Sequence, residues 1–151
     1  MTAVLLTAAV LLNGIGAGIM LATVVGIVPF LLTMPYQRYV ETVKFLWPRY
    51  DPMMPILNVA TVVLDVALTF TATGRTRTLV PVAGALLLSV IVISVTRNVP
   101  INRYVTALDP ARSPADWPTR DPRVRWRNWN LLRTLLATAA LTVNAAAAVQ
   151  R

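Results

Sequence analysis

A single acidic residue interrupts one of the long apolar runs of this sequence. Asp65 stands about ten residues into the run from Pro55 to Thr73, roughly 15 Å deep if the run is a helix that rises 1.5 Å per residue. A carboxylate is costly at that depth, and such residues usually face a protein interior and take part in function. We predict that Asp65 is a catalytic base for a carbon or phenol acid. The alternative is a hydrogen-bonded aspartate that only ties helices together.

Tryptophan, asparagine and arginine recur at helical spacing near the fourth apolar run. In a helix, Trp126, Asn130 and Arg133 share one face, and Trp129 neighbours Arg133. Such a face could stack on a flat polar ligand and hold an oxyanion with the guanidinium. Arg133 is therefore predicted as a second catalytic residue, and it is also the expected ionic partner of Asp65. The plainer alternative is an aromatic belt with basic anchors at the level of the lipid headgroups.

Two asparagines and an arginine follow the third apolar run, in the segment 97–102 with the sequence RNVPIN. Val99 precedes a proline and is pushed away from helical geometry, so the helix should stop near Asn98 with a left-handed cap. Asn98 and Asn102 would then offer amide groups at the mouth of a cavity, where Arg97 could meet the oxygens of a ligand. The alternative is a helix end with two asparagine caps, and an Arg97 that extends to the membrane surface.

Further amides and hydroxyls lie inside the apolar runs. Asn58 precedes Asp65 by seven residues and projects from nearly the same helix face, while Asn13 lies about ten residues into the first run. We include both asparagines among the predicted substrate-binding residues. For each of them, as for Ser89 and Ser94, the alternative is an inter-helix hydrogen bond worth roughly 0.6–2 kcal/mol.

The composition excludes several classes of function. The chain of 151 residues is 56% hydrophobic and 13% charged, and it contains neither histidine nor cysteine. Disulfides, His- or Cys-based metal sites and catalytic Cys or His residues are therefore excluded, and the few scattered acids predict no metal site. A net charge of +8 is common in nucleic-acid-binding proteins, but the long apolar runs indicate a lipid bilayer and no nucleic-acid partner.

The apolar runs predict an all-α, integral membrane four-helix bundle that forms a single four-span domain over residues 1–151. A helix of about 20 apolar residues crosses a bilayer. Gly26 and Pro29 should loosen or end the first helix, and a long loop is expected over 99–123. The Gly14-x-x-x-Gly18 spacing allows close helix approach within the bundle or in a homo-oligomer. The predicted helices cover about 3–33, 55–73, 78–98 and 124–149.

The distribution of basic residues predicts the orientation in the membrane. Ten of them lie in the first and third connections, against three on the opposite side, namely Arg75, Arg77 and Arg151. Basic loops favour the cytoplasm, so both longer loops should be cytoplasmic and both termini outside. The preference for arginine over lysine, with much alanine and valine, is typical of GC-rich bacterial genomes and indicates a bacterial plasma membrane. The ten residues are Arg38, Lys44, Arg49, Arg97, Arg103, Arg112, Arg120, Arg123, Arg125 and Arg127.

Together the Gly-rich first helix, the Asn-Val-Pro-x-Asn segment and the Trp-x-x-Trp-Asn-x-x-Arg segment identify a known pattern. The sequence resembles the anthrone oxygenase-like family of small four-helix membrane proteins. The resemblance implies oxidation of an apolar aromatic, polyketide-type substrate with O2 as co-substrate and no added cofactor. The matching positions are Asn98, Pro100, Asn102, Trp126, Asn130 and Arg133.

The resemblance also implies roles for the predicted residues. An anthrone carries an acidic C–H, and its anion reacts directly with O2. Asp65, which matches no family motif, would be the base, and Arg133 would hold an oxyanion together with the asparagines. Trp126 and Trp129 would stack on the rings.

Two other functions remain open from the sequence. The same cavity could catalyse a cyclisation or rearrangement of a polyketide or similar natural product without O2. Alternatively, the chain could be a small transporter or a membrane scaffold subunit. No internal repeat and no paired broken helices, which are common in transporters, are evident from the sequence.

Overall fold

The computed structural model describes residues 1–150 of the chain, and this part contains helices and no strand. Arg151, which the orientation prediction counts, lies outside the described residues. The elements in chain order are α1 (Thr2–Ala22), the π-helical turn η1 (Thr23–Ile27), α2 (Val28–Thr33), α3 (Tyr36–Tyr50), α4 (Met53–Thr71), α5 (Gly74–Ile93), the π-helical turn η2 (Ser94–Asn98), α6 (Val99–Ala107), α7 (Trp117–Arg120) and α8 (Arg123–Val149).

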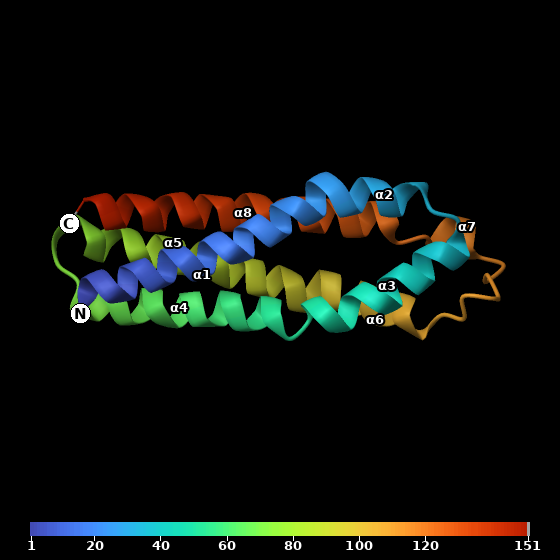
Figure 1. The fold of residues 1–151 in the computed structure, drawn as a ribbon, viewed down its shortest axis with the longest axis horizontal. Helices are drawn as coiled ribbons and strands as arrows, with labels where there is room; N and C mark the ends of the chain where they lie inside the picture. The colour runs from blue at the N-terminus through green and yellow to red at the C-terminus, as the bar shows by residue number, and fades with distance from the viewer. Residues whose placement is uncertain (151) are drawn as a thin grey trace.

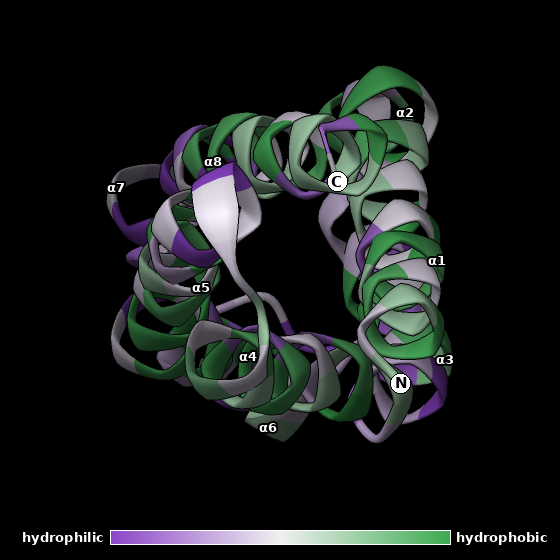
Figure 2. Ribbon diagram, turned by 90° about the vertical axis from the view of Figure 1, so that its left-hand side faces the viewer, coloured by the Kyte–Doolittle hydropathy of each residue, from purple (hydrophilic) through white to green (hydrophobic). Residues whose placement is uncertain are grey.

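These elements combine into four helical segments that are long and apolar enough to cross a membrane, so the chain is a multi-pass membrane protein. In the bundle, α1 packs against α4 and α8, and α5 packs against the same two helices. Viewed along its length, the bundle therefore has four sides, with α1 facing α5 and α4 facing α8 (Figure 2). The predicted all-α four-helix membrane bundle is confirmed.

The two ends of the bundle differ. Both chain termini lie at one end, whereas α2, α3, α6 and α7 gather at the other, which we call the cap end (Figure 1). In the cap, the buried ring of Trp117 meets the ring of Tyr36 edge to face, with centroids 4.8 Å apart. The hydroxyl of Tyr36 donates to the carbonyl of Asp109 over 2.8 Å. Aromatic packing thus holds the connection before α8 against α3.

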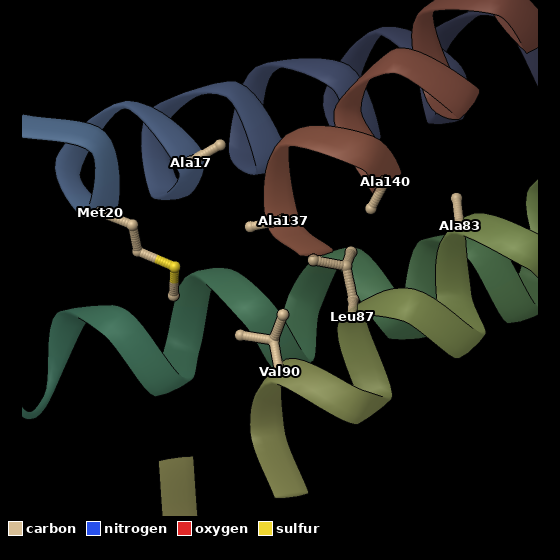
Figure 3. Packing of buried hydrophobic residues seen from close by; sticks show 7 residues of the cluster. All are labelled: Ala17, Met20, Ala83, Leu87, Val90, Ala137 and Ala140. Atoms are coloured by element: carbon tan, nitrogen blue, oxygen red, sulfur yellow. The ribbon is translucent and has the colours of Figure 1, made fainter. Parts of the chain in front are cut away.

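Small side chains bring the helices of the bundle close together. One buried cluster joins α1, α5 and α8 (Figure 3). It consists of Ala17 and Met20 of α1, Ala83, Leu87 and Val90 of α5, and Ala137 and Ala140 of α8. The four alanines of this cluster allow the helix backbones to approach closely, which favours association where lipid offers no hydrophobic driving force between helices. This cluster lies between the buried residues near the chain termini and those of the cap.

The first and third membrane helices each contain a π-helical turn directly before a Val-Pro pair. Proline lacks an N–H and its ring clashes with the preceding turn of an α-helix, and a wider turn relieves that clash. In both turns the first hydroxyl donates to the carbonyl four residues earlier, from Thr23 to Ile19 over 2.8 Å and from Ser94 to Val90 over 2.6 Å. The expected loosening near Gly26 and Pro29 is confirmed.

The predicted stop of the third helix near Asn98 is wrong. Asn98 has right-handed helical angles, φ −81° and ψ −44°, and the chain continues as α6 to Ala107. The π-helical turn accommodates Pro100 without ending the helix. Both π-helical turns lie within continuous membrane helices, Thr2–Thr33 and Gly74–Ala107, so neither helix is broken at its proline.

Two predicted connections are also more helical than expected. The first connection contains the 15 residues of α3, and the long loop expected over 99–123 contains α6 and α7. α5 begins at Gly74, which has a positive φ of 58°, an angle that glycine adopts without steric cost. The helix consequently starts four residues before the predicted 78.

Candidate functional site

A cavity opens inside the cap end of the bundle, where η1, α3, α4, η2 and α8 converge. Its volume is about 180 Å³, enough for on the order of ten water molecules or one flat small molecule. Apolar side chains form most of its wall, and a few polar groups face it, as is usual for small-molecule sites. Its apolar wall includes Ile19, Met20, Ile27, Leu31, Val43, Leu46, Met54, Val59, Ile91 and Val95.

The structure brings six of the ten predicted site residues to this cavity and leaves four outside. Asn13, Asp65, Arg97 and Trp129 are not part of its wall. Both family-type segments of the second half contribute, one from η2 and α6 and the other from α8. The six lining residues are Asn58, Asn98, Asn102, Trp126, Asn130 and Arg133.

Arg133 provides the positive charge of the cavity. Its guanidinium donates to Ser94 Oγ over 2.7 Å and to Asn130 Oδ1. The backbone of α8 allows the second contact because Asn130 precedes Arg133 by one helical turn. Among the described residues, no carboxylate lies within 4.0 Å of Arg133. A largely buried cation without a counter-ion strongly favours an anionic ligand.

Several buried polar atoms around Arg133 lack a hydrogen-bond partner among the described residues. They are both amide atoms of Asn98, the indole nitrogen of Trp126 and Nε of Arg133. Asn98 is only 2% exposed. Buried polar atoms are nearly always paired, and each unpaired one needs an explanation. Here they all belong to residues of the cavity wall, so a ligand with its own polar atoms would satisfy them.

Asp65 lies elsewhere, and its predicted ion pair with Arg133 is wrong. Asn144 Nδ2 donates to Asp65 Oδ2 over 3.4 Å, across the diagonal of the bundle from α8 to α4. Arg133 precedes Asn144 by eleven residues in the same helix, or about 16 Å by helix rise. A Cβ atom at Gly84 would lie 3.4 Å from the Cβ atom of Asp65, so α5 closes tightly over the pair. The role of Asp65 as a base stays a prediction, without a place in the cavity wall.

We expect Asp65 to stabilise the bundle through Asn144. The substitution Asp65→Ala leaves a buried amide without its partner, which should lower the free energy of unfolding by about 1–3 kcal/mol. Asp65→Asn keeps a side chain that can bond to Asn144 and should unfold close to the parent protein. Unfolding of the three proteins in one detergent measures this difference. Equal stability of parent and alanine variant would show that the pair contributes nothing.

Arg97 and Trp129 pair with each other outside the cavity. The exposed guanidinium of Arg97 lies 5.2 Å from the centre of the Trp129 ring, within the range of a cation–π interaction. The two side chains thereby join η2 to α8 next to the cavity. Asn13, the remaining predicted residue, is buried within the bundle, and its Nδ2 has no partner among the described residues.

Sequence reasoning missed one wall of the cavity. Trp47, Tyr50 and Asp51 come from α3 and the turn after it. The signal was present, since Val43, Leu46, Trp47 and Tyr50 follow each other at i, i+3, i+4 and i+7, which is typical of an amphipathic helix. A helix inferred from that spacing would have predicted an aromatic face for this part of the chain. Ser94, read as helix glue, is also in the wall.

The arrangement suits the stabilisation of a planar anion. A guanidinium held by two partners is ready to receive an oxyanion, and amide groups beside it supply further donors. The aromatic and aliphatic wall excludes water, which strengthens each of these interactions. Asp51 is the one carboxylate in the wall, and among the described residues no three acidic side chains gather to hold a metal ion.

Comparison with known proteins gives one match. Residues 45–143 match the family model described as Anthrone oxygenase. The match covers most of the chain and includes α4, α5 and the cavity-lining part of α8. No curated protein and no solved structure matches the chain.

Proposed function

The chain belongs to the anthrone oxygenase family, and from that premise we propose that it oxidises an anthrone-type aromatic substrate with O2 in the cavity around Arg133. The substrate would be apolar and polyketide-like, with fused rings that carry a ketone and phenolic oxygens. We propose further that no cofactor is required and that the protein works in a bacterial plasma membrane with its cap in the cytoplasm. The lipid bilayer would deliver such a substrate and accept its product.

One observation carries this proposal. The cavity combines the guanidinium of Arg133, which has no acidic partner among the described residues, with the unpartnered amide of Asn98. Such a site stabilises negative charge that forms on a bound molecule. The anion of an anthrone is flat and carries its charge partly on oxygen, so it matches both the apolar walls and the polar groups.

The reaction depends on forming that anion. An anthrone has a methylene carbon opposite its ketone, and removal of one proton leaves an electron pair spread over the rings and the ketone oxygen. Arg133 and Asn98 would stabilise this oxygen in the transition state more than in the neutral substrate, which is the condition for catalysis. The electron-rich anion can then react with O2 directly.

The proposal is tested with purified protein in detergent, dialysed against a chelator and supplied with emodin anthrone. Quinone absorbance and O2 consumption are followed together against a buffer control. We expect quinone and consumed O2 in equal amounts, well above the slow background oxidation. A rate no higher than background would contradict the proposal, and loss of substrate without O2 consumption would instead support cyclisation or rearrangement.

Ser94 should act as a positioning residue in this reaction. Ser94→Ala removes the oxygen that accepts from Arg133 over 2.7 Å, and the loss of one such bond is worth about 1 kcal/mol, or roughly fivefold in kcat/KM. Ser94→Thr keeps a hydroxyl, as Thr23 does at the matching position of η1, and should restore the rate. Michaelis constants and turnover numbers of the three proteins measure the effect. Equal loss in both variants would mean that the hydroxyl is not what positions Arg133.

Transport is a second candidate, and a specific observation favours it. The π-helical turns η1 and η2 widen two continuous membrane helices at matching positions, and both contribute to the cavity wall. π-helical turns are frequent at functional sites, whereas helices that are fully broken at the binding site are the pattern typical of transporters. The test is flux of an anthraquinone carboxylate into liposomes that contain the protein. Flux that depends on the protein, without any O2 consumption, would favour transport over oxidation.

A further inference from the structure

We propose that Asp51 is the general base that removes the methylene proton of the substrate. This assignment rests on the proposed function, because it names the group that starts the same reaction. The sequence assigned this role to Asp65, whose burial in the bundle made it prominent. In the structure, the acidic residue that lines the cavity is Asp51, at the turn between α3 and α4.

The first argument is the state of the six acidic side chains of the chain. Five of them are engaged, each accepting a hydrogen bond within the described part of the protein. Asp51, an exposed residue of the cavity wall, is the exception, because its carboxylate has neither a hydrogen bond nor an ion pair among the described residues. The engaged side chains are those of Glu41, Asp65, Asp109, Asp116 and Asp121.

The second argument is the position of Asp51. It lies in the cavity wall, whereas Asp65 does not. The contacts of Asp65 with Asn144 and with Gly84 fix the registers of α4, α8 and α5. Asp51 precedes Asp65 by fourteen residues, toward the cap. The same number of residues separates Asn130 from Asn144 in α8, and Gly84 in α5 from Asn98 in η2.

Equal spacing along neighbouring helices puts residues at about the same level. Asn98 and Asn130 are therefore at about the same level, with Arg133 one helical turn beyond them, and Asp51 lines the same cavity from the turn before α4. No ion pair joins Asp51 to Arg133, so the carboxylate is free to accept a proton.

The proton and electron balance follows from this layout. The Asp51 carboxylate accepts one methylene proton, and the carbon keeps the electron pair of the broken C–H bond. O2 is reduced by this anion as a C–O bond forms, and the resulting peroxide takes the proton back from Asp51. The carboxylate then removes the second proton of that carbon while the O–O bond breaks, and the released hydroxide takes up this proton to give water. One oxygen atom remains as the new ketone, and no external reductant is needed.

The test compares Asp51→Asn, Asp51→Ala and Asp51→Glu with a matched control, Glu41→Gln, which neutralises an exposed carboxylate of α3 outside the cavity wall. General-base catalysis contributes about 10²–10⁴-fold, so we expect a loss of turnover of that size in the asparagine and alanine variants. Glu41→Gln should turn over like the parent. Asp51→Glu should recover part of the rate, and added acetate should partly rescue Asp51→Ala.

A substrate with deuterium at the methylene carbon supplies a readout that a purely structural role would not move. The isotope effect on turnover should be larger in Asp51→Asn than in the parent protein, because proton removal then limits the rate. Full turnover of Asp51→Asn beside an active parent would overturn the assignment and leave the proposed function standing. Loss of turnover in Asp65→Asn together with full turnover in Asp51→Asn would return the role to Asp65. A parent protein that does not oxidise the anthrone would overturn both proposals.

Discussion

Arg133→Ala is expected to lower kcat/KM for the anthrone about 10²–10³-fold without unfolding the protein. The size of the loss is that found when a single oxyanion-stabilising donor is removed from an enzyme. The bundle should survive because the substitution removes a charge that is buried without an acidic partner among the described residues. Such a charge destabilises the folded state unless a ligand of opposite charge binds to it.

Arg127→Ala is the matched control for this substitution. Arg127 is an exposed arginine of the same helix, it lies outside the cavity wall, and its side chain bonds to Asn128. It should turn over like the parent protein. Arg133→Lys should fall between the parent and the alanine variant, because lysine keeps the charge and loses the fork that bonds to Ser94 and Asn130. Parent-level turnover in Arg133→Ala would show that the reaction does not take place in this cavity.

The second large effect is expected at Asn98, where activity and stability should change in opposite directions. Asn98→Leu keeps the size of the side chain and removes two buried amide atoms that have no partner among the described residues. A hydrogen bond to a charged group is worth about 1.5–3 kcal/mol, so kcat/KM should fall about 10–150-fold. Relief of the unpaired atoms should raise the free energy of unfolding by about 1 kcal/mol or more.

Both quantities are measured on one preparation, by steady-state turnover and by thermal unfolding in detergent. Asn128→Leu, a substitution at an exposed position of α8, should leave turnover unchanged. Opposite changes at Asn98 are typical of a residue kept for function at the expense of stability. A less stable and fully active Asn98→Leu protein would instead show that Asn98 only stabilises the fold.

The membrane bundle was predictable because each transmembrane helix is determined by the residues of one continuous stretch of sequence. A run of about 20 apolar residues has few alternatives to a transmembrane helix, and the runs that contain Asp65 and Arg133 are helical as predicted. Within one helix, spacing also places side chains, so the shared face of Asn130 and Arg133 was foreseen. Their hydrogen bond confirms that Asn130 and Arg133 meet.

Relations between helices were harder to predict. Nothing in the run around Asp65 indicates how far α4 is shifted against α8, and it is this register that pairs Asp65 with Asn144 and takes it about 16 Å from Arg133. The continuation beyond Asn98 was missed because a proline normally ends a helix, and the π-helical turn that accommodates it has no clear sequence signal. The contribution of α3 to the cavity wall could have been predicted from the helical spacing of Leu46, Trp47 and Tyr50.

The most direct test of the central claim follows the oxygen atoms themselves. Purified protein, freed of metal ions by a chelator and without added cofactor, is given emodin anthrone under ¹⁸O2, and the quinone is analysed by mass spectrometry. We predict that one labelled oxygen atom appears in the quinone, at a rate far above the buffer control, and that Arg133→Ala loses this excess. A quinone without label, or labelling at the same rate in the parent protein, the variant and buffer, would contradict oxygenation in this cavity.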